Sequence, residues 1–394
     1  CKEAINNIVR YCEKIGASIV ATPQGKGLVN PYHPNFYGVC GLAGHESATD
    51  LLKSKDTDLI IIVGSALDQF AICGWKPSDV EVYKFVHIDS IADHFSRSQY
   101  AILNVFGNIR LIFGHLNNLS RPTSNKKSPQ KQNTAAYTIK PIPFERRRLE
   151  RRKQYAHPIN TGHRTSERRE ISTITKPLFR NFKLIDELKY LNDESPIKPQ
   201  RLMYELSKRA PENTRFLADM GNSFLWAIHY LNPHPNKKTD NYNYLTMGMG
   251  FASMAWCIGA AIGIALANPK NPIICIVGDG SFLMSAHELT VAVQLKLPII
   301  YIVLNDQAYG MVKHGQNLSG AESIGSDLPP IDFALYARAI GAQGITVKSP
   351  EDFANIDILM HCQANGPVLI DAHIDATEAP PLSERIKMIA SGKN

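Results

Sequence analysis

The sequence has few cysteines and no cysteine motif of the kind that binds metal or forms a redox pair. Its seven cysteines are scattered, their number is odd, and no CxxC pair occurs. A disulfide framework and a cysteine-based zinc site are therefore not expected. Reduced thiols in a cytoplasmic protein are the interpretation that this usage favours.

Targeting and membrane segments are also lacking. No signal peptide opens the chain,. The uncharged stretch 245–267 is long enough to cross a bilayer, but its glycines favour a buried turn followed by a helix,. No membrane association is expected. The first residue is Cys1 instead of Met, and helical periodicity begins at once, so we expect sequence to be missing upstream,.

Acidic and aromatic residues are scarce in one basic segment. Residues 121–180 hold 16 Lys and Arg against four Glu, a balance of +12 in a chain of net charge +7, so the remainder carries about −5. Without sustained apolar runs, residues 119–195 are interpreted as a solvated basic linker. Nucleic acid is not an expected partner, because aromatic side chains are not interleaved with the basic ones.

Two regions on either side of this segment alternate strand-like and helix-like patterns. In residues 1–118 the expected helices are 2–15 and 46–53, and the expected strands are 18–21, 59–64 and 83–88,. In residues 196–394 the expected strands are 216–218, 273–277, 299–304 and 367–371, and the expected helices are 199–209, 285–295 and 332–340,. The sequence thus predicts an α/β protein with two doubly wound parallel-sheet domains joined by the long basic linker.

Two loops at the ends of expected strands carry the chemistry. Gly278-Asp279-Gly280-Ser281 follows the strand 273–277, and Asn305-Asp306-Gln307-Ala308 follows the strand 299–304. Carboxyl ends of parallel strands meet at one edge, so both loops should face the same ligand. Asp279 and Asp306 offer the hard oxygens that Mg²⁺ prefers, with the Ala308 carbonyl as a further oxygen. Gly278 and Gly280 allow close backbone approach, and Ser281 opens a turn with free N–H groups for a phosphate.

A Gly-Asp-Gly sequence alone is a common turn, but the pair of loops resembles a known motif. Residues 278–284 and 304–312 resemble the thiamine diphosphate motif of the acetolactate synthase, pyruvate oxidase and benzoylformate decarboxylase superfamily. The resemblance implies thiamine diphosphate bound through Mg²⁺, with Asp279, Asp306 and the Ala308 carbonyl as metal ligands. Relatives usually carry Asn at the position of Asp306, so this chain has one more negative charge there.

The same resemblance assigns further roles. It implies that Gly221, Asn222 and Ser223 contact the diphosphate, together with Gly278, Gly280 and Ser281. Met254 stands where relatives hold the cofactor in a bent shape, although plain core packing stays open for it, and the Ala252 carbonyl would accept from the 4′-amino group. Met311 and Val312 match apolar substrate positions. Gly315 stands where relatives that favour larger acceptors place Trp.

The first region resembles the central domain of these enzymes, with its first strand missing. The matching segments are 22–27, 41–45, 64–68 and 87–89. FAD is not expected, because Gln69 and Phe70 stand where FAD-binding relatives often carry Arg. The domain boundaries expected are 1–118, 119–195 and 196–394.

The resemblance implies decarboxylation or carboligation of a 2-keto acid such as pyruvate, in a homo-oligomer, a dimer or a tetramer. The pyrimidine domain that carries the family's catalytic Glu is absent, so the chain is expected to be a fragment that catalyses poorly alone, and no catalytic residue is assigned. Two alternatives stay open. One is a catalytically inactive homologue that acts as a partner or regulatory subunit, and the other is an anionic-surface binder that uses residues 121–180.

Overall fold

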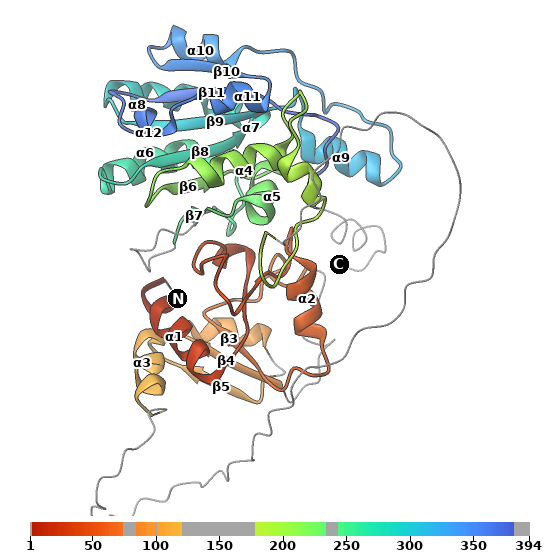
Figure 1. Ribbon diagram of the computed structural model, residues 1–394, viewed down its shortest axis with the longest axis vertical. Coiled ribbons are helices and arrows are strands. Elements are labelled where there is room, and N and C mark those ends of the chain that lie inside the picture. The colour runs from red at the N-terminus through yellow and green to blue at the C-terminus, as the bar shows by residue number, and fades with distance from the viewer. Residues whose placement is uncertain (1, 74–83, 99–100, 120–177, 234–242, 382–394) are drawn as a thin grey trace, which may run out of the picture. The chain divides into compact units, whose positions relative to one another are not determined.

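The computed structural model describes residues 2–73, 84–98, 101–119, 178–233 and 243–381 (Figure 1). Residues 1–120 and 177–394 form one compact unit. Nearly all of the expected linker, including most of its basic residues, lies outside the described part of the chain. The expected α/β class with parallel sheets is confirmed for both regions that flank it.

A six-stranded parallel sheet organises the C-terminal region. Its strands follow the order β10-β11-β9-β8-β6-β7, as they are stacked in Figure 1. The strands are β6 (Arg215–Ala218), β7 (Leu245–Thr246), β8 (Ile273–Gly278), β9 (Ile299–Asn305), β10 (Gln343–Val347) and β11 (Val368–His373). The chain order reverses between β6 and β8, because β7 lies on one side of β6 and β8 on the other.

The central strands β8 and β9 are apolar on both faces. Ile274 and Ile276 enter one core cluster, whereas Ile273, Cys275 and Val277 enter a second cluster. Successive side chains of a strand point to opposite faces, so each cluster occupies one face of the sheet. This explains why the sequence reads as continuous apolar runs, which is typical of parallel strands covered by helices on both sides.

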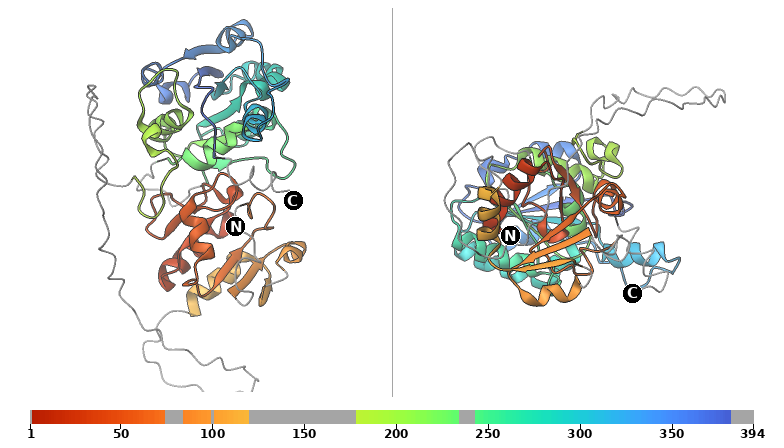
Figure 2. Two further views of the ribbon diagram at one scale, coloured as in Figure 1. Left: turned by 90° about the vertical axis from the view of Figure 1, so that its right-hand side faces the viewer. Right: turned by 90° about the horizontal axis from the view of Figure 1, so that it is seen from below.

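Helices cover both faces of this sheet, as the turned views in Figure 2 show. The first cluster is completed by α4 (Pro199–Arg209), α5 (Asn222–Tyr230), α11 (Pro350–Ala354) and α12 (Ile358–His361). The second is completed by α6 (Trp256–Ala267), α7 (Asp279–Ser285), α8 (Leu289–Gln294) and α10 (Phe333–Ala339). Local sequence sets their starts: Pro199 occupies the first turn of α4, and Ser349 and Asp352 form a reciprocal cap on α11,.

The N-terminal region contains two small parallel sheets. The first pairs β1 (Ile19–Ala21) with β2 (Phe36–Val39), and the second has the order β3-β4-β5, with β3 (Ile60–Val63), β4 (Phe85–Asp89) and β5 (Leu103–Phe106). The helices are α1 (Ile5–Ile15), α2 (Glu46–Lys53) and α3 (Ile109–Leu119). α1 and α3 cover one face of the three-stranded sheet through Ile8, Ile88 and Phe113.

Residues 178–195 differ from the solvated linker expected for them. Phe179, Phe182, Leu184 and Tyr190 are buried in the first core cluster. Their apolar side chains are spaced among Arg, Lys and Asp, so composition hides them. We therefore propose that the C-terminal domain begins near residue 178, earlier than the expected boundary at 196.

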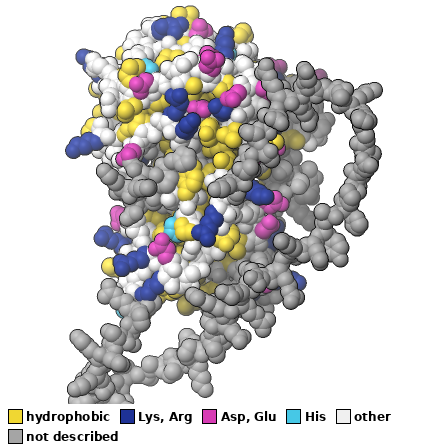
Figure 3. Space-filling view, in the orientation of Figure 1, with side chains coloured by type: hydrophobic (Ala, Val, Ile, Leu, Met, Phe, Trp, Pro, Cys, Tyr) yellow, Lys and Arg dark blue, Asp and Glu magenta, His cyan; other side chains and the backbone are white. Residues whose placement is uncertain are grey.

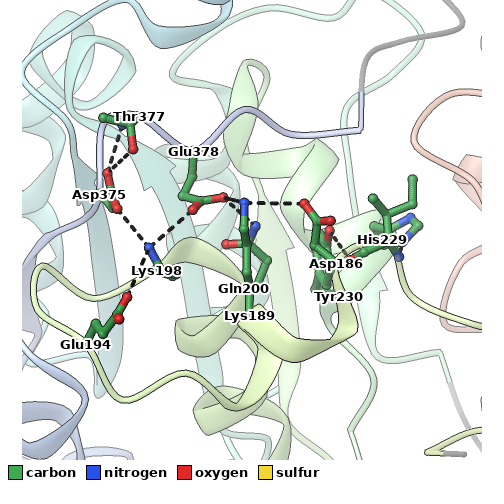
Figure 4. A network of polar contacts seen from close by, with 11 residues as sticks. Asp186, Lys189, Glu194, Lys198, Gln200, His229, Tyr230, Asp375, Thr377 and Glu378 are labelled. Atoms are coloured by element: carbon green, nitrogen blue, oxygen red, sulfur yellow. Dashed lines mark hydrogen bonds and ion pairs between the residues drawn. The ribbon is translucent and has the colours of Figure 1, made fainter. Parts of the chain in front are cut away.

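A buried ionic network fixes the segment after β11. Glu378, which is 8% exposed, accepts from Lys189 at 2.8 Å and from Gln200 at 2.9 Å, as Figure 4 shows. Lys198 pairs with Asp375 at 3.0 Å and with Glu378 at 3.3 Å. The network ties residues 375–378 to the start of α4. The end of α4 leads into the start of β6, so the start of α4 lies near the opposite edge of the sheet, where the strands end. Asp375 follows the end of β11, so the network lies at this carboxyl edge.

The described surface mixes charges of both signs. Figure 3 shows Lys and Arg side chains interspersed with Asp and Glu on the face that it presents. The stretch 245–267 contains only one helix, α6, of 12 residues. Within the described ranges, no helix has the length and hydropathy that a membrane span requires.

Candidate functional site at the carboxyl edge of the sheet

The site forms where the strand order reverses. Open α/β sheets bind ligands beyond the carboxyl ends of strands at such a reversal. Here β6 ends at Ala218 and β8 at Gly278, and these two strands are neighbours. β9 lies on the other side of β8, so the loops after β6, β8 and β9 share one edge.

Asp279 lies at the start of α7, directly after β8. Its side chain is 2% exposed. One carboxylate oxygen accepts from the Gly280 N–H at 2.7 Å, and the other accepts from the Ala308 N–H at 3.3 Å. The second bond joins the two loops that the sequence predicted to meet.

Asp306 reaches the same place from the end of β9. Gln307 has φ = 54°, a left-handed conformation that turns the chain sharply after Asp306,. The Leu328 N–H donates to the Gln307 carbonyl at 2.8 Å, and the Tyr309 N–H donates to the Ser326 carbonyl at 2.7 Å. This turn directs the Ala308 N–H toward Asp279 and leaves the Asp306 carboxylate beside it.

The two carboxylates perturb each other. Burial raises the pKa of the Asp279 carboxyl, and the charge of Asp306 raises it further. Burial also raises the pKa of Asp306, against the opposing effect of nearby backbone N–H groups. Two acids that share a buried space at neutral pH favour either a shared proton or a cation. In the part of the chain that the structure describes, no group of three or more His, Cys, Asp and Glu side chains is arranged to hold a metal ion. A cation held by this pair therefore needs backbone or ligand oxygens as well.

Asn222, the first residue of α5, completes the group. A Cβ built on Gly310 would lie 2.4 Å from an Asp306 carboxylate oxygen and 2.7 Å from Asn222 Nδ2. Gly310 is therefore required so that Asn222 and Asp306 can meet over the start of α9 (Gly310–Leu318),. Asn222 Oδ1 is buried without a hydrogen-bond partner. An unpaired buried acceptor beside an acid pair fits a site that is completed by a cation or a donor.

The start of α5 offers the free N–H groups that an anion needs. Its cap residue Gly221 has φ = 119°, a conformation that favours glycine, and no side chain caps this helix end,. An added Cβ at Gly221 would meet nothing within 4 Å, so the space in front of the helix is open. The predicted trio Gly221, Asn222 and Ser223 thus lies at a helix start suited to a phosphate.

Three predicted contacts are already used within the protein. The Ser223 hydroxyl donates to the Asp219 carbonyl at 2.8 Å. The Ser281 hydroxyl contacts the Asp219 carboxylate and accepts from the Ala255 N–H at 2.8 Å. An added Cβ at Gly280 would lie 2.6 Å from the Tyr309 ring, so this glycine makes room for a side chain. Any contact of these residues with a ligand would use their backbone.

The remaining predicted residues differ in burial and in the elements that carry them. Gly278 caps α7, and space around it is open. Ala252 has φ = 59° and lies in the turn before α6, whereas Met254 is half-buried against the first core cluster. Core packing thus describes what Met254 contacts within the chain. Met311 is half-buried and Val312 is 51% exposed, both in the first turn of α9.

Fold and site together define a doubly wound α/β protein with two neighbouring carboxylates at a strand reversal. The chain matches two family models, "Thiamine pyrophosphate enzyme, C-terminal TPP binding domain" over residues 219–372 and "Thiamine pyrophosphate enzyme, central domain" over residues 1–116. It belongs to the thiamine pyrophosphate enzyme family. The first match begins at Asp219, so it contains every predicted site residue.

Similar curated proteins are acetolactate synthases. The chain is 26% identical over 379 residues to a putative acetolactate synthase large subunit of Mycobacterium tuberculosis. The aligned region covers 93% of this chain and 57% of that protein. The chain is 24% identical over 379 residues to an acetolactate synthase of Bacillus subtilis, with 95% and 57% covered. It is 26% identical over 395 residues to an acetolactate synthase large subunit of Cyanidium caldarium, with 99% and 58% covered. The chain thus spans somewhat more than half the length of these relatives.

Proposed function

We propose that this chain binds thiamine diphosphate through Mg²⁺ and takes part in decarboxylation or carboligation of a 2-keto acid such as pyruvate. The observation that carries the proposal is the buried Asp279–Asp306 pair at the tips of β8 and β9. Membership of the thiamine pyrophosphate enzyme family and similarity to acetolactate synthases support it.

In this proposal, Mg²⁺ is held by the carboxylates of Asp279 and Asp306 and by the Ala308 carbonyl. These are the hard oxygens that the ion prefers, and diphosphate oxygens complete its coordination. The cation removes the repulsion between the two acids. The start of α5, with Gly221 and Asn222, donates backbone N–H groups to the diphosphate.

When bound, thiamine diphosphate supplies the electron sink for loss of CO₂ from the substrate. The protein binds and orients. Ala252 and Met254 lie in the segment before α6 and would contact the middle of the cofactor. Met311 and Val312 would give the substrate an apolar wall. The chain matches only part of the length of the acetolactate synthases. We therefore propose the 2-keto acid substrate and the homo-oligomer together with the activity.

Titration calorimetry tests the binding step directly. Thiamine diphosphate is titrated into the full chain with Mg²⁺, and again with the metal chelated. We expect binding only with Mg²⁺, and we expect Asp279→Ala to lower the affinity at least about tenfold, because it removes one charged ligand. Asp58→Ala, an exposed acid on the N-terminal region, is the charge-matched control. Equal affinities for wild type and Asp279→Ala would refute the site.

A turnover assay separates the proposed enzyme from an inactive homologue. Consumption of pyruvate by the chain, alone or with added partner chains, supports the catalytic proposal. Mg²⁺-dependent cofactor binding without turnover under any combination would favour a partner or regulatory subunit instead.

A further inference from the structure

Asp219, the first residue after β6, is a buried carboxylate at the centre of the site's framework. Its side chain is fully buried. One oxygen accepts from the Ala255 N–H at 2.6 Å, and the other accepts from the Cys257 N–H at 3.0 Å. The Ser281 hydroxyl donates to the same carboxylate.

These partners belong to three different segments. Ala255 and Cys257 lie at the start of α6, directly after the turn that contains Ala252 and Met254. Ser281 lies in the first turn of α7, two residues after Asp279. Asp219 itself precedes the loop Gly221–Ser223. One carboxylate therefore connects the three segments to which the cofactor contacts are assigned.

The donors that contact the Asp219 carboxylate are neutral N–H and O–H groups. Within the described residues, no Lys, Arg or His lies at ion-pair distance from it. A buried carboxylate is stabilised by several N–H and O–H donors and by the positive end of a helix, here α6. Because its two oxygens are occupied by donors from both helices, a shift of either helix would leave part of the charge unsatisfied. The carboxylate thus restricts the relative positions of α6 and α7.

We propose that Asp219 is a positioning residue that holds the α6 turn, the α7 start and the β6 loop in the arrangement that binds the cofactor. It contacts neither metal nor cofactor, and it acts through Ser281 and the N–H groups of α6. This inference rests on the proposed function for its effect on affinity. A plain helix cap on α6 would explain the two N–H bonds, but it would not explain the hydroxyl contributed by α7.

The test compares Asp219→Asn with wild type. Asn keeps the size but replaces one acceptor oxygen with a donor, which would face an N–H or the Ser281 hydroxyl. We expect the affinity for thiamine diphosphate at saturating Mg²⁺ to fall about tenfold, with a folded protein. Asp357→Asn is the matched control, because Asp357 caps α12 through the Met360 N–H at 2.9 Å and contacts none of the three segments.

A second variant examines the route of the effect. Ser281→Ala should weaken binding less than Asp219→Asn, and the double variant should bind no more weakly than Asp219→Asn alone. Additive losses would contradict action through Ser281. The fluorescence emission of Trp256, the first residue of α6, should shift to longer wavelength in Asp219→Asn. Comparison with Trp256→Phe identifies the part of the protein's emission that comes from Trp256.

Hydrogen exchange without ligand keeps the inference separate from the proposed function. In Asp219→Asn, amides of both 252–257 and 279–284 should exchange at least about tenfold faster, whereas those of α12 should not change. Acceleration confined to 252–257 would reduce Asp219 to a helix cap and overturn the inference. Failure of the wild type to bind thiamine diphosphate would instead overturn the proposed function. The exchange rates of 252–257 and 279–284 would then still show whether Asp219 holds both segments.

Discussion

Neutralising Asp279 should stabilise the metal-free protein at alkaline pH while it removes Mg²⁺ binding. The reason is the raised pKa of this carboxyl, about 7 against an ordinary value of 3.8, caused first by burial and then by the charge of Asp306. An acid with a raised pKa in the folded state binds its proton more tightly there than in the unfolded chain. Its stability contribution is complete below about pH 4 and is lost as pH rises through about 7.

The size of the effect follows from the same values. Each tenfold change in proton affinity is worth about 1.4 kcal/mol, so complete ionisation costs about 4 kcal/mol. Asp279→Asn removes this cost. However, its amide nitrogen faces the Ala308 N–H, and the loss of this hydrogen bond destabilises the variant by roughly 1 kcal/mol. The variant should therefore be more stable than wild type by about 3 kcal/mol at pH 8, which raises Tm by roughly 4 °C for a chain of this size.

Thermal unfolding from pH 4.5 to pH 8.5, with the metal chelated, measures the effect. The wild-type Tm should fall with rising pH more steeply than that of Asp279→Asn, and added Mg²⁺ should raise only the wild-type Tm. Asp371→Asn is the control for loss of a buried acid, because Asp371 accepts from the Asn305 amide and the Phe333 N–H and lies outside the pair. Parallel Tm curves for wild type and Asp279→Asn would refute the reasoning.

Two further variants test the surroundings of the site. Gly310→Ala should lower Mg²⁺-dependent cofactor affinity about tenfold by pushing Asp306 and Asn222 apart, whereas Gly315→Ala, in open space in the same helix, should bind normally in calorimetry,. Glu378→Gln should destabilise the protein by about 1–3 kcal/mol in urea unfolding, because Lys189 and Lys198 lose their buried partner,. Although burial opposes the shift, bonds from Lys189 and Gln200 and nearby positive charge hold the pKa of Glu378 below its usual value. The variant should therefore lose less stability than wild type as pH falls below about 4.5, and an unchanged acid profile would count against the network.

The sequence predicted the central strands and the acid pair because both depend on local pattern. Apolar runs marked β8 and β9, and the residue types at their ends marked Asp279 and Asp306. α5 was not predicted, because it is buried on nearly every side and lacks an amphipathic pattern,. β2 was not among the expected strands, because its four residues include Gly38 and gain their strand geometry from pairing with β1. A helix was expected over 285–295, where the structure has α8 over Leu289–Gln294, and α7 over Asp279–Ser285 was not predicted.

The hydrogen-bond partners of Asp219 were beyond sequence reasoning. Asp219 stands in a segment that was singled out for Gly221 and Asn222, but its own partners lie 36 to 62 residues away. No spacing rule connects it to Ala255 or Ser281. A signal was present nonetheless, since an Asp that directly follows a buried strand must find donors if its side chain is buried. Likewise, only coordinates show that Ser281 directs its hydroxyl away from the open space.

The double-sided burial of β8 and β9 has a consequence for how the acid pair binds. Strands wedged between two tightly packed layers deform little, so the ends that bear Asp279 and Asp306 cannot drift apart to relax their mutual repulsion,. The cost of bringing two like charges together is met during folding, before any ligand arrives. A divalent ion then meets two carboxylates that are already held together, so its affinity should depend more on the stiffness of the sheet than on the loops around it.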